Sequence, residues 1–396
     1  MRIRLMALMA LILVSACGRL TNAAPSGSYR LYEAVAQSDA PMVALIDTRP
    51  RAAHGQLPIG TPSSDWKHYY TVKSGSLLDI DPETGATQAR VTLPGDYQLP
   101  AATNSGIPGG LSQNGGWLVL QRFDVSASHL LVADTTFQTA PRSIDLSGQF
   151  QFDAVSNDGD RVYLIQSIGN GDYHVRVYVI SAGALDPNFV VDKKEGGDAM
   201  TGLKLSGVAS HDGHWLFSVY ARAHQGAFIH ALNLDSTFAL CLDLPGTGYA
   251  DGSNASLDWS LALSPDGTRL FASNPATGVV TEILTVNPSV GRTVKAGSPS
   301  SVWPAGAVVS ADGQTLAIAG AAGIVWLDTS TLTVRGHALD TWTVRSLALS
   351  PDGRKLYAVN DMGALAELSM AGRTVTTTFD PGIAHPIALM RVEALA

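Results

Sequence analysis

A four-residue turn motif, Ser-x-Asp-Gly or a close variant, recurs along the chain and constrains the fold more than any other sequence feature. In the copy at residues 350–353 it lies between two apolar runs, 347–349 and 356–359. Aspartate can hydrogen-bond the backbone two residues further on, and glycine adopts a positive φ without steric cost. The motif therefore predicts a tight hairpin between two short β-strands.

The hairpin motif returns at nearly regular intervals. Further copies begin at Ser310, Ser264, Ser210 and Ser156, and looser ones at Ser112 and Ser63. The turn glycines Gly115, Gly159, Gly213, Gly267, Gly313 and Gly353 are 44, 54, 54, 46 and 40 residues apart. A repeat of roughly 40–45 residues with four short strands is typical of a β-propeller blade. The sequence therefore predicts an all-β propeller of four-stranded antiparallel blades.

The two ends of the chain predict how the ring closes. Residues 29–35 resemble the second strand of a blade, and residues 386–392 resemble a first strand with no hairpin after it. The C-terminal strand is therefore expected to pair with the N-terminal strand and close the ring, which would remove two exposed sheet edges. This arrangement gives eight blades. Seven is the alternative, because the outer strand near residues 51–59 is short.

These motifs resemble the Ser-Pro-Asp-Gly repeats of the YVTN and WD40-like propeller families, over nearly all of the mature chain. The Asp-Pro-Glu-Thr-Gly stretch at residues 81–85 is also similar to repeats of pyrroloquinoline-quinone-type propellers. The resemblance implies the fold. It implies no particular activity, because propellers carry many unrelated functions.

The first residues of the chain predict export and lipidation. Arg2 and Arg4 precede an apolar run at residues 5–14 that is too short to span a bilayer. Val-Ser-Ala-Cys at residues 14–17 resembles the bacterial lipobox, which implies cleavage before Cys17 and lipidation of that residue. An ordinary secretory signal is the alternative. We therefore expect a signal peptide at 1–16, a lipidated Cys17 and tether at 17–28, one propeller domain at 29–396, and an extracytoplasmic protein anchored to a bacterial membrane.

Charge and motif content exclude several function classes. The chain has 26 basic and 34 acidic residues, and loss of Arg2 and Arg4 changes this to 24 against 34, a net charge of −10. This acidic balance without a basic cluster argues against nucleic acid as a partner. Cys241 lies in an apolar run and is expected to be a buried small hydrophobe. The sequence predicts no catalytic residue, no metal site and no cofactor, and His211 and His214, which flank one turn, lack a third ligand.

Loop length and tryptophan position indicate a binding face. The longest loops, at residues 168–173, 192–198, 222–226 and 246–252, should open on one face, and loops on a rigid scaffold commonly carry binding. Neutral insertions are the alternative. Three tryptophans stand five to eight residues before a turn serine, where an inner strand begins near the channel mouth, and four charged residues or histidines have comparable positions. The candidate face consists of Trp259, Trp303, Trp342, Asp258, Lys204, Arg345 and His385. Packing of the tryptophans between neighbouring blades is the alternative.

The favoured function is that of a non-enzymatic platform that binds a protein, a peptide or a component of the cell envelope. The alternatives are an enzyme of the sugar lactonase or quinone-dependent dehydrogenase type, which share the fold, and a small-molecule binding protein. The lining of the channel mouth should separate these classes. Converging carboxylates and histidines would indicate an enzyme, whereas aromatic and neutral residues would indicate binding.

Overall fold

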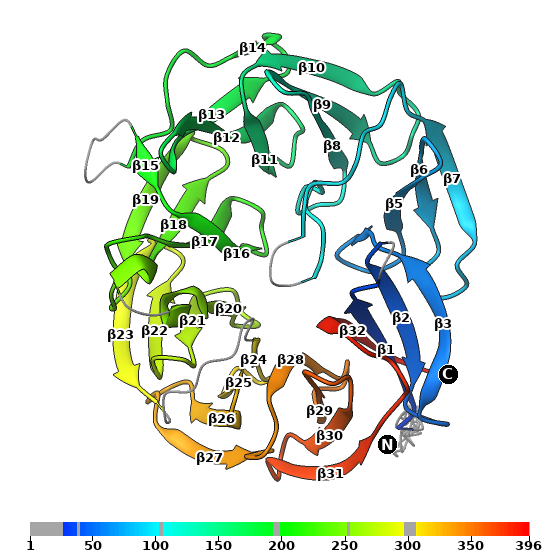
Figure 1. The fold of residues 1–396 in the computed structure, drawn as a ribbon, viewed down its shortest axis with the longest axis vertical. Helices are drawn as coiled ribbons and strands as arrows, with labels where there is room; N and C mark the ends of the chain where they lie inside the picture. Colours follow the sequence, from blue (N-terminus) through cyan, green and yellow to red (C-terminus); the bar gives the residue numbers. More distant parts are fainter. Residues whose placement is uncertain are drawn as a thin grey trace, which may run out of the picture.

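In the computed structural model, eight antiparallel sheets are arranged as blades around a central channel (Figure 1). The structure describes residues 27–37, 40–102, 106–192, 199–251, 254–296 and 306–395. The sheets confirm the eight-bladed, all-β propeller. Within these ranges the only helices are two 3₁₀ turns, η1 (Tyr249–Asp251) and η2 (Asn254–Leu257), and no helix is long and apolar enough to cross a membrane. The proposed signal segment and Cys17 lie outside the described residues.

The blades follow one another around the ring, and the first strand given for each blade lies at the channel except in blade 3 (Figure 1). Blade 1 contains β32 (Pro386–Ala394), β1 (Tyr29–Val35), β2 (Met42–Asp47) and β3 (Ala52–Pro58). Blade 2 contains β4 (Thr61–Pro62), β5 (Tyr69–Lys73), β6 (Ser76–Ile80) and β7 (Thr87–Thr92), and blade 3 contains β8 (Trp117–Phe123), β9 (Ala127–Asp134) and β10 (Arg142–Ser147). Blade 4 contains β11 (Phe150–Val155), β12 (Arg161–Gly169), β13 (Asp172–Val179), β14 (Ala184–Leu185) and β15 (Met200–Thr201).

The second half of the ring is regular. Blade 5 contains β16 (Leu203–Ala209), β17 (Trp215–Ala221), β18 (Phe228–Asn233) and β19 (Phe238–Asp243), and blade 6 contains β20 (Ser260–Leu263), β21 (Arg269–Asn274), β22 (Val279–Leu284) and β23 (Ser289–Lys295). Blade 7 contains β24 (Ala307–Val309), β25 (Thr315–Gly320), β26 (Gly323–Asp328) and β27 (Val334–Ala338), and blade 8 contains β28 (Val344–Leu349), β29 (Lys355–Asn360), β30 (Leu365–Ser369) and β31 (Thr374–Phe379). Eight apolar clusters, one between each pair of adjacent blades, form the core of the described chain.

The Ser-x-Asp-Gly turns share one local structure. The hydroxyl of Ser350 donates to Asp352 (Oγ–Oδ1, 2.6 Å) and accepts the backbone N–H of Lys355 at 2.9 Å. Asp352 also accepts the N–H of Arg354 at 3.1 Å, and the N–H of Gly353 donates to the carbonyl of Ser350 at 2.8 Å. The serine-to-aspartate bond recurs in the copies that begin at Ser156, Ser210, Ser264 and Ser310. The predicted hairpins are confirmed, and the bonds explain why serine and aspartate recur together with glycine.

The turn glycines have the backbone conformation that the repeat predicts, with φ between 67° and 74° at all six positions. Replacing Gly159 with alanine is expected to lower the free energy of unfolding by about 1–3 kcal/mol. An added Cβ there would also lie 2.3 Å from the indole ring of Trp117. Gly55→Ala is the matched control, because Gly55 is exposed in a strand without a positive φ and the nearest atom to an added Cβ is 3.7 Å away. Equal midpoints of chemical unfolding for the two variants would contradict this role of the turn glycines.

The N- and C-terminal strands close the ring as predicted. β32 pairs antiparallel with β1, from Tyr29 opposite Ala394 to Val35 opposite Pro386. The hydroxyl of Tyr32 donates to the carboxylate of Glu393 at 2.7 Å, which adds a side-chain bond to the ladder. The pairing places chain segments from both ends of the sequence in one sheet (Figure 1).

Blade 3 departs from the expected four strands. Its innermost position is taken by an irregular stretch whose described residues pair with β8 at two isolated bridges, Gln98 with Gln121 and Leu111 with Leu118. Pro100 lies between these bridges, and a proline cannot donate a ladder hydrogen bond. Because Pro100 interrupts the ladder of hydrogen bonds with β8, the inner strand predicted for blade 3 does not form.

The stretch between the two bridges extends into the channel (Figure 1), and we call its described residues, 99–102 and 106–110, the channel segment. A Cβ on Gly106 would lie 3.0 Å from the Cβ of Ala34 and 3.1 Å from that of Ala388, so the segment reaches across to blade 1. The hydroxyl of Thr61 in blade 2 donates to the carbonyl of Pro108. These contacts to blades 1 and 2 hold the channel segment in place inside the channel.

Candidate functional site

A cavity of about 680 Å³ lies in the channel, between the channel segment and the inner strands of blades 2, 4 and 5. The walls are mainly neutral and include the aromatic rings of Phe123 and Phe152 and the amides of Gln121 and Gln151. Among the described residues that line it, only Asp153 and Lys204 are charged. We call this space the channel cavity.

The two charged residues of the channel cavity form an ion pair. The Nζ atom of Lys204 lies 2.5 Å from Oδ1 of Asp153, and the Asp153 side chain is 2% exposed. Asp153 stands in a bulge of β11 between Phe152 and Ala154, and Lys204 borders a bulge in β16. Bulges redirect side chains relative to regular alternation. The bulges therefore aim residues of two neighbouring inner strands at each other across the interface of blades 4 and 5.

Four buried polar side chains lie between blades 4 and 5: Tyr173, Ser218, Tyr220 and His230. We call them the polar cluster. The cross-strand register places Ser218 opposite His230, and the Tyr220 ring lies 5.6 Å from the Tyr173 ring and 5.8 Å from the His230 ring. All four are at most 4% exposed. Their Oη, Oγ and Nε2 atoms have no hydrogen-bond partner among the described residues. Buried polar atoms of this kind are usually satisfied by ordered water or by a ligand.

Burial keeps the polar cluster uncharged. It lowers the pKa of His230 to about 4, and the weaker opposing effect of the Asp153 carboxylate does not offset it. The imidazole is therefore neutral at pH 7. Burial raises the pKa of both Tyr173 and Tyr220 well above the usual range, so both phenols stay protonated. The cluster thus offers hydrogen bonds without a net charge.

Gly207 lies between the polar cluster and the channel cavity. It lies on β16, lines the cavity and pairs in register with Ser218. A Cβ at this position would lie 3.0 Å from Oγ of Ser218 and 3.5 Å from Cε of Lys204. The absence of a side chain therefore makes Gly207 a thin part of the cavity wall next to the polar cluster, while Ser218 itself is 2% exposed and lies behind that wall.

Of the candidate residues from the sequence, Lys204 lies in the channel cavity, and the structure does not bring the others to it. Trp259 is 2% exposed in the apolar cluster between blades 5 and 6, and Trp342 packs partly buried against the cluster between blades 7 and 8. These two side chains take the packing arrangement stated as the alternative. Trp303 lies outside the described residues.

The remaining candidates are dispersed around the ring. Asp258 is buried directly after η2, Arg345 is partly buried in a bulge of β28, and His385 is exposed before β32 with a φ of 59°. Arg345 and Asp153 both lie in inner-strand bulges, in different blades. Within the described chain, no group of three or more histidine, cysteine, aspartate or glutamate side chains is placed to hold a metal ion.

Sequence reasoning missed Asp153 and the polar cluster. The available signal was a polar residue between two apolar neighbours inside a predicted strand, as with Asp153 in β11 and His230 in β18. Cys241, expected to be a buried hydrophobe, is partly buried against the same blade 4–5 core, opposite His230. Its backbone N–H donates to the Asp192 carboxylate at 3.3 Å.

Comparison with known proteins identifies the fold. No model of a protein family matches the chain, and no curated protein sequence matches it. Among solved structures, apo AztD from Citrobacter koseri is similar over 92% of this chain and 98% of its own, with a TM-score of 0.59 and 12% identity. The dihydro-heme d1 dehydrogenase NirN in complex with DHE is similar over 92% of this chain and 75% of its own, with a TM-score of 0.57 and 14% identity. Likeness at these identities shows the propeller fold.

Proposed function

We propose that the protein is an extracytoplasmic, lipid-anchored binding protein of the YVTN/WD40-like propeller type, which holds an uncharged ligand in the channel cavity. The observation that carries the proposal is the lining of this cavity. In the described chain, its single carboxylate is neutralised by Lys204, and no histidine lines it. Aromatic rings and amides provide the other specific contacts, which supports binding over catalysis.

The polar cluster defines the chemistry of the ligand. A buried polar group without a partner costs about 1–3 kcal/mol, so a ligand that supplies partners gains affinity. Ser218 is the member of the polar cluster next to Gly207, where the wall of the channel cavity has no side chain. A neutral molecule rich in hydroxyl and amide groups would stack on Phe152 in the channel cavity and direct a polar group at Ser218. Envelope saccharides have this composition.

Replacing Gly207 with valine is expected to weaken the binding of such a ligand at least about tenfold, because the new side chain would fill the space beside Ser218 and Lys204 at the cavity wall. The probe is N,N′-diacetylchitobiose, which carries hydroxyl and acetamide groups, titrated calorimetrically into the folded protein. Gly55→Val, on the exposed outer strand of blade 1, is the control and should bind as the wild type does. Equal affinity of the Gly207 variant and the wild type, or no binding by the wild type, would contradict the proposal.

An enzyme is the second candidate, and one arrangement favours it. The neutral imidazole of His230 lies next to Ser218 and Tyr220, and a neutral imidazole can accept a proton. The dehydrogenase activity in the name of NirN belongs to a protein of the same fold. Mass spectrometry of the probe after prolonged incubation separates the two functions. Unchanged probe supports a binding protein, and a converted probe that requires His230 supports an enzyme.

Membrane anchoring through Cys17 gives a separate prediction. Cys17→Ser should move the protein from the membrane pellet to the soluble fraction, because the variant lacks the residue that would carry the lipid. Several acyl chains on one residue hold a protein at a membrane, whereas a single chain exchanges. The melting temperature of the propeller should not change. Retention of the variant in the pellet after a high-salt wash would contradict lipid anchoring. In this proposal the membrane is a partner through the lipid, and the ligand is a component of the envelope.

A further inference from the structure

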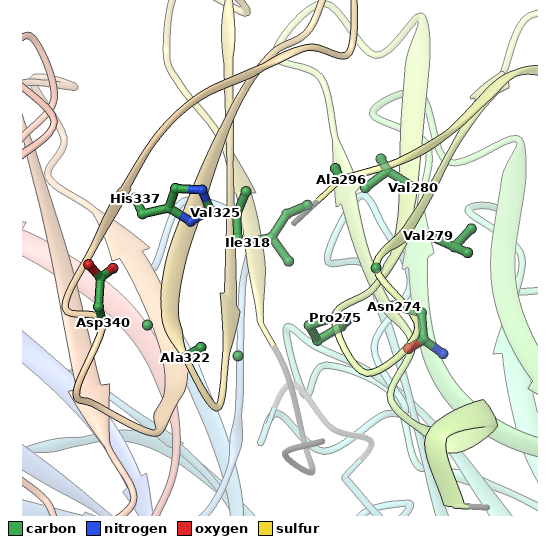
Figure 2. Close-up of a pocket in the computed structure, with 13 residues that line it drawn as sticks. Asn274, Pro275, Val279, Val280, Ala296, Ile318, Ala322, Val325, His337 and Asp340 are labelled. Carbon is green, nitrogen blue, oxygen red and sulfur yellow. The ribbon is translucent and has the colours of Figure 1, made fainter. Parts of the chain in front are cut away.

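A second cavity, of about 220 Å³, lies between blades 6 and 7 (Figure 2). It is formed where the turn between β21 and β22 faces the turn between β25 and β26. These turns join the second and third strands of their blades, so the cavity opens on the face opposite the Ser-x-Asp-Gly turns. We call it the interblade pocket. It shares no lining residue with the channel cavity.

The walls of the interblade pocket are aliphatic. Val280 and Ile318 belong to the apolar cluster between blades 6 and 7, and Val325 packs against that cluster. Figure 2 shows Val325 and Ile318 from blade 7 facing Pro275 from blade 6. A dry apolar cavity of about 150 Å³ is known to hold benzene. The larger volume here suits a two-ring aromatic group.

Three polar side chains line the pocket, His337 and Asp340 on the blade 7 side and Asn274 on the blade 6 side. His337 lies on β27 and Asp340 follows that strand, and both side chains are exposed (Figure 2). Neither has a hydrogen bond or an ion pair to another described residue. Asn274 is occupied, because its amide donates to the Ala255 carbonyl at 2.7 Å and accepts the Thr277 N–H at 3.0 Å. The Asp340 carboxylate is therefore the charged group that is available to a molecule in the pocket.

The glycine turn in blade 7 holds this side of the pocket in place. Gly323 has a φ of +85°, and a Cβ there would lie 2.2 Å from the carbonyl oxygen of Ala338. Its N–H donates to the carbonyl of Trp342 at 2.9 Å. The turn and the segment that carries Asp340 are thus in direct backbone contact, which holds the backbone of Asp340 at the edge of the pocket.

We propose that the interblade pocket is a binding site for a small aromatic amine. The ring system lies between Val280, Ile318 and Val325, and the ammonium group lies at the Asp340 carboxylate. No lysine or arginine is among the described residues that line the pocket, so no ammonium or guanidinium group there repels a bound cation. A neutral aromatic molecule gains free energy only from the burial of its ring between the apolar walls. An aromatic carboxylate is in addition repelled by the negative charge of Asp340.

The test titrates the folded protein with tryptamine, indole and indole-3-acetate, which share one ring system and differ in charge. Tryptamine is expected to bind most tightly and indole-3-acetate most weakly. Asp340→Asn should weaken tryptamine by about two- to fivefold and leave indole unchanged, as expected for one exposed charge pair. Asp361→Asn, at an exposed aspartate in the β29–β30 turn, is the matched control and should not change either affinity.

A second variant fills the pocket from its exposed edge. Ala322 lies in the exposed turn between β25 and β26, so Ala322→Phe adds a ring at the pocket without replacing a core side chain. This variant should lose tryptamine binding at an unchanged melting temperature. Gly207→Val, which alters the channel cavity, should bind tryptamine as the wild type does. The proposal is overturned if the wild type binds no tryptamine, if indole binds as tightly, or if Ala322→Phe binds normally.

Discussion

Deletion of residues 384–396 is expected to unfold the whole propeller. The deletion removes β32, whose partner β1 would then carry an unpaired edge, and it opens the ring between blades 8 and 1. Leu389 and Val392 are at most 6% exposed and belong to the apolar cluster between these blades. Loss of the β32 side chains from this cluster, together with the hydrogen bonds between β32 and β1, should lower the free energy of unfolding by more than about 5 kcal/mol. This is of the order of the stability of a whole domain.

The deletion can be measured by thermal unfolding and by size-exclusion chromatography. Leu389→Ala provides a graded comparison and should cost about 2–5 kcal/mol while the ring stays closed. A synthetic peptide of residues 386–395 should restore a cooperative transition if the opened ring survives as a soluble species. A truncated protein with the melting temperature and elution volume of the wild type would show that β32 is a dispensable tail.

The blade architecture could be predicted from the sequence because local chemistry determines it. Each Ser-x-Asp-Gly turn is held by bonds within six residues, such as those of Ser350, so the motif means the same hairpin wherever it occurs. The blade count followed from the two ends, since residues 29–35 and 386–392 are complementary parts of one repeat. Both inferences depend on short-range patterns that tertiary packing does not override.

The channel segment could not be predicted in the same way. Its course depends on a contact between Gly106 and blade 1, far away in the sequence, and on the bond from Thr61. The prolines of the segment indicate only that a regular inner strand is disfavoured. They do not indicate whether the chain turns away from the channel or into it.

The candidate site was harder to predict, because bulges decide where the inner-strand side chains point. Trp259 precedes its turn serine by five residues whether it faces the channel or the neighbouring blade. The structure buries it in the interface. Asp153 faces the site because of the bulge in β11, and a polar residue between two apolar neighbours in the sequence does not reveal such a bulge.

Replacement of Glu33 is the second change with a large expected effect, and it should stabilise the protein. Glu33 is fully buried in β1, opposite Ala44 and Leu389 of the apolar cluster between blades 8 and 1. Both carboxyl oxygens lack a hydrogen-bond partner among the described residues. Burial alone raises the pKa of Glu33 to about 8. The folded protein therefore holds this carboxyl protonated at a pH where the unfolded chain has released the proton.

This shift makes stability depend on pH in one direction. Between the ordinary glutamate value of 4.5 and a folded-state pKa of about 8, the unfolded chain binds fewer protons, so stability falls as the pH rises. The loss amounts to about 1.4 kcal/mol per pH unit and to about 5 kcal/mol over the whole window. Below pH 4.5 the contribution of Glu33 is fully retained, and above pH 8 it is lost.

Glu33→Leu is therefore expected to raise the free energy of unfolding by about 3–5 kcal/mol at pH 8 relative to the wild type, and by much less at pH 4.5. Glu33→Gln is the matched control for shape and polarity, since it keeps a buried polar group but cannot ionise. The difference between Glu33→Gln and the wild type should grow steadily with pH over the same window. Chemical unfolding at pH 4.5, 6 and 8 measures all three proteins, and a difference that is constant with pH would show that Glu33 does not titrate within the fold.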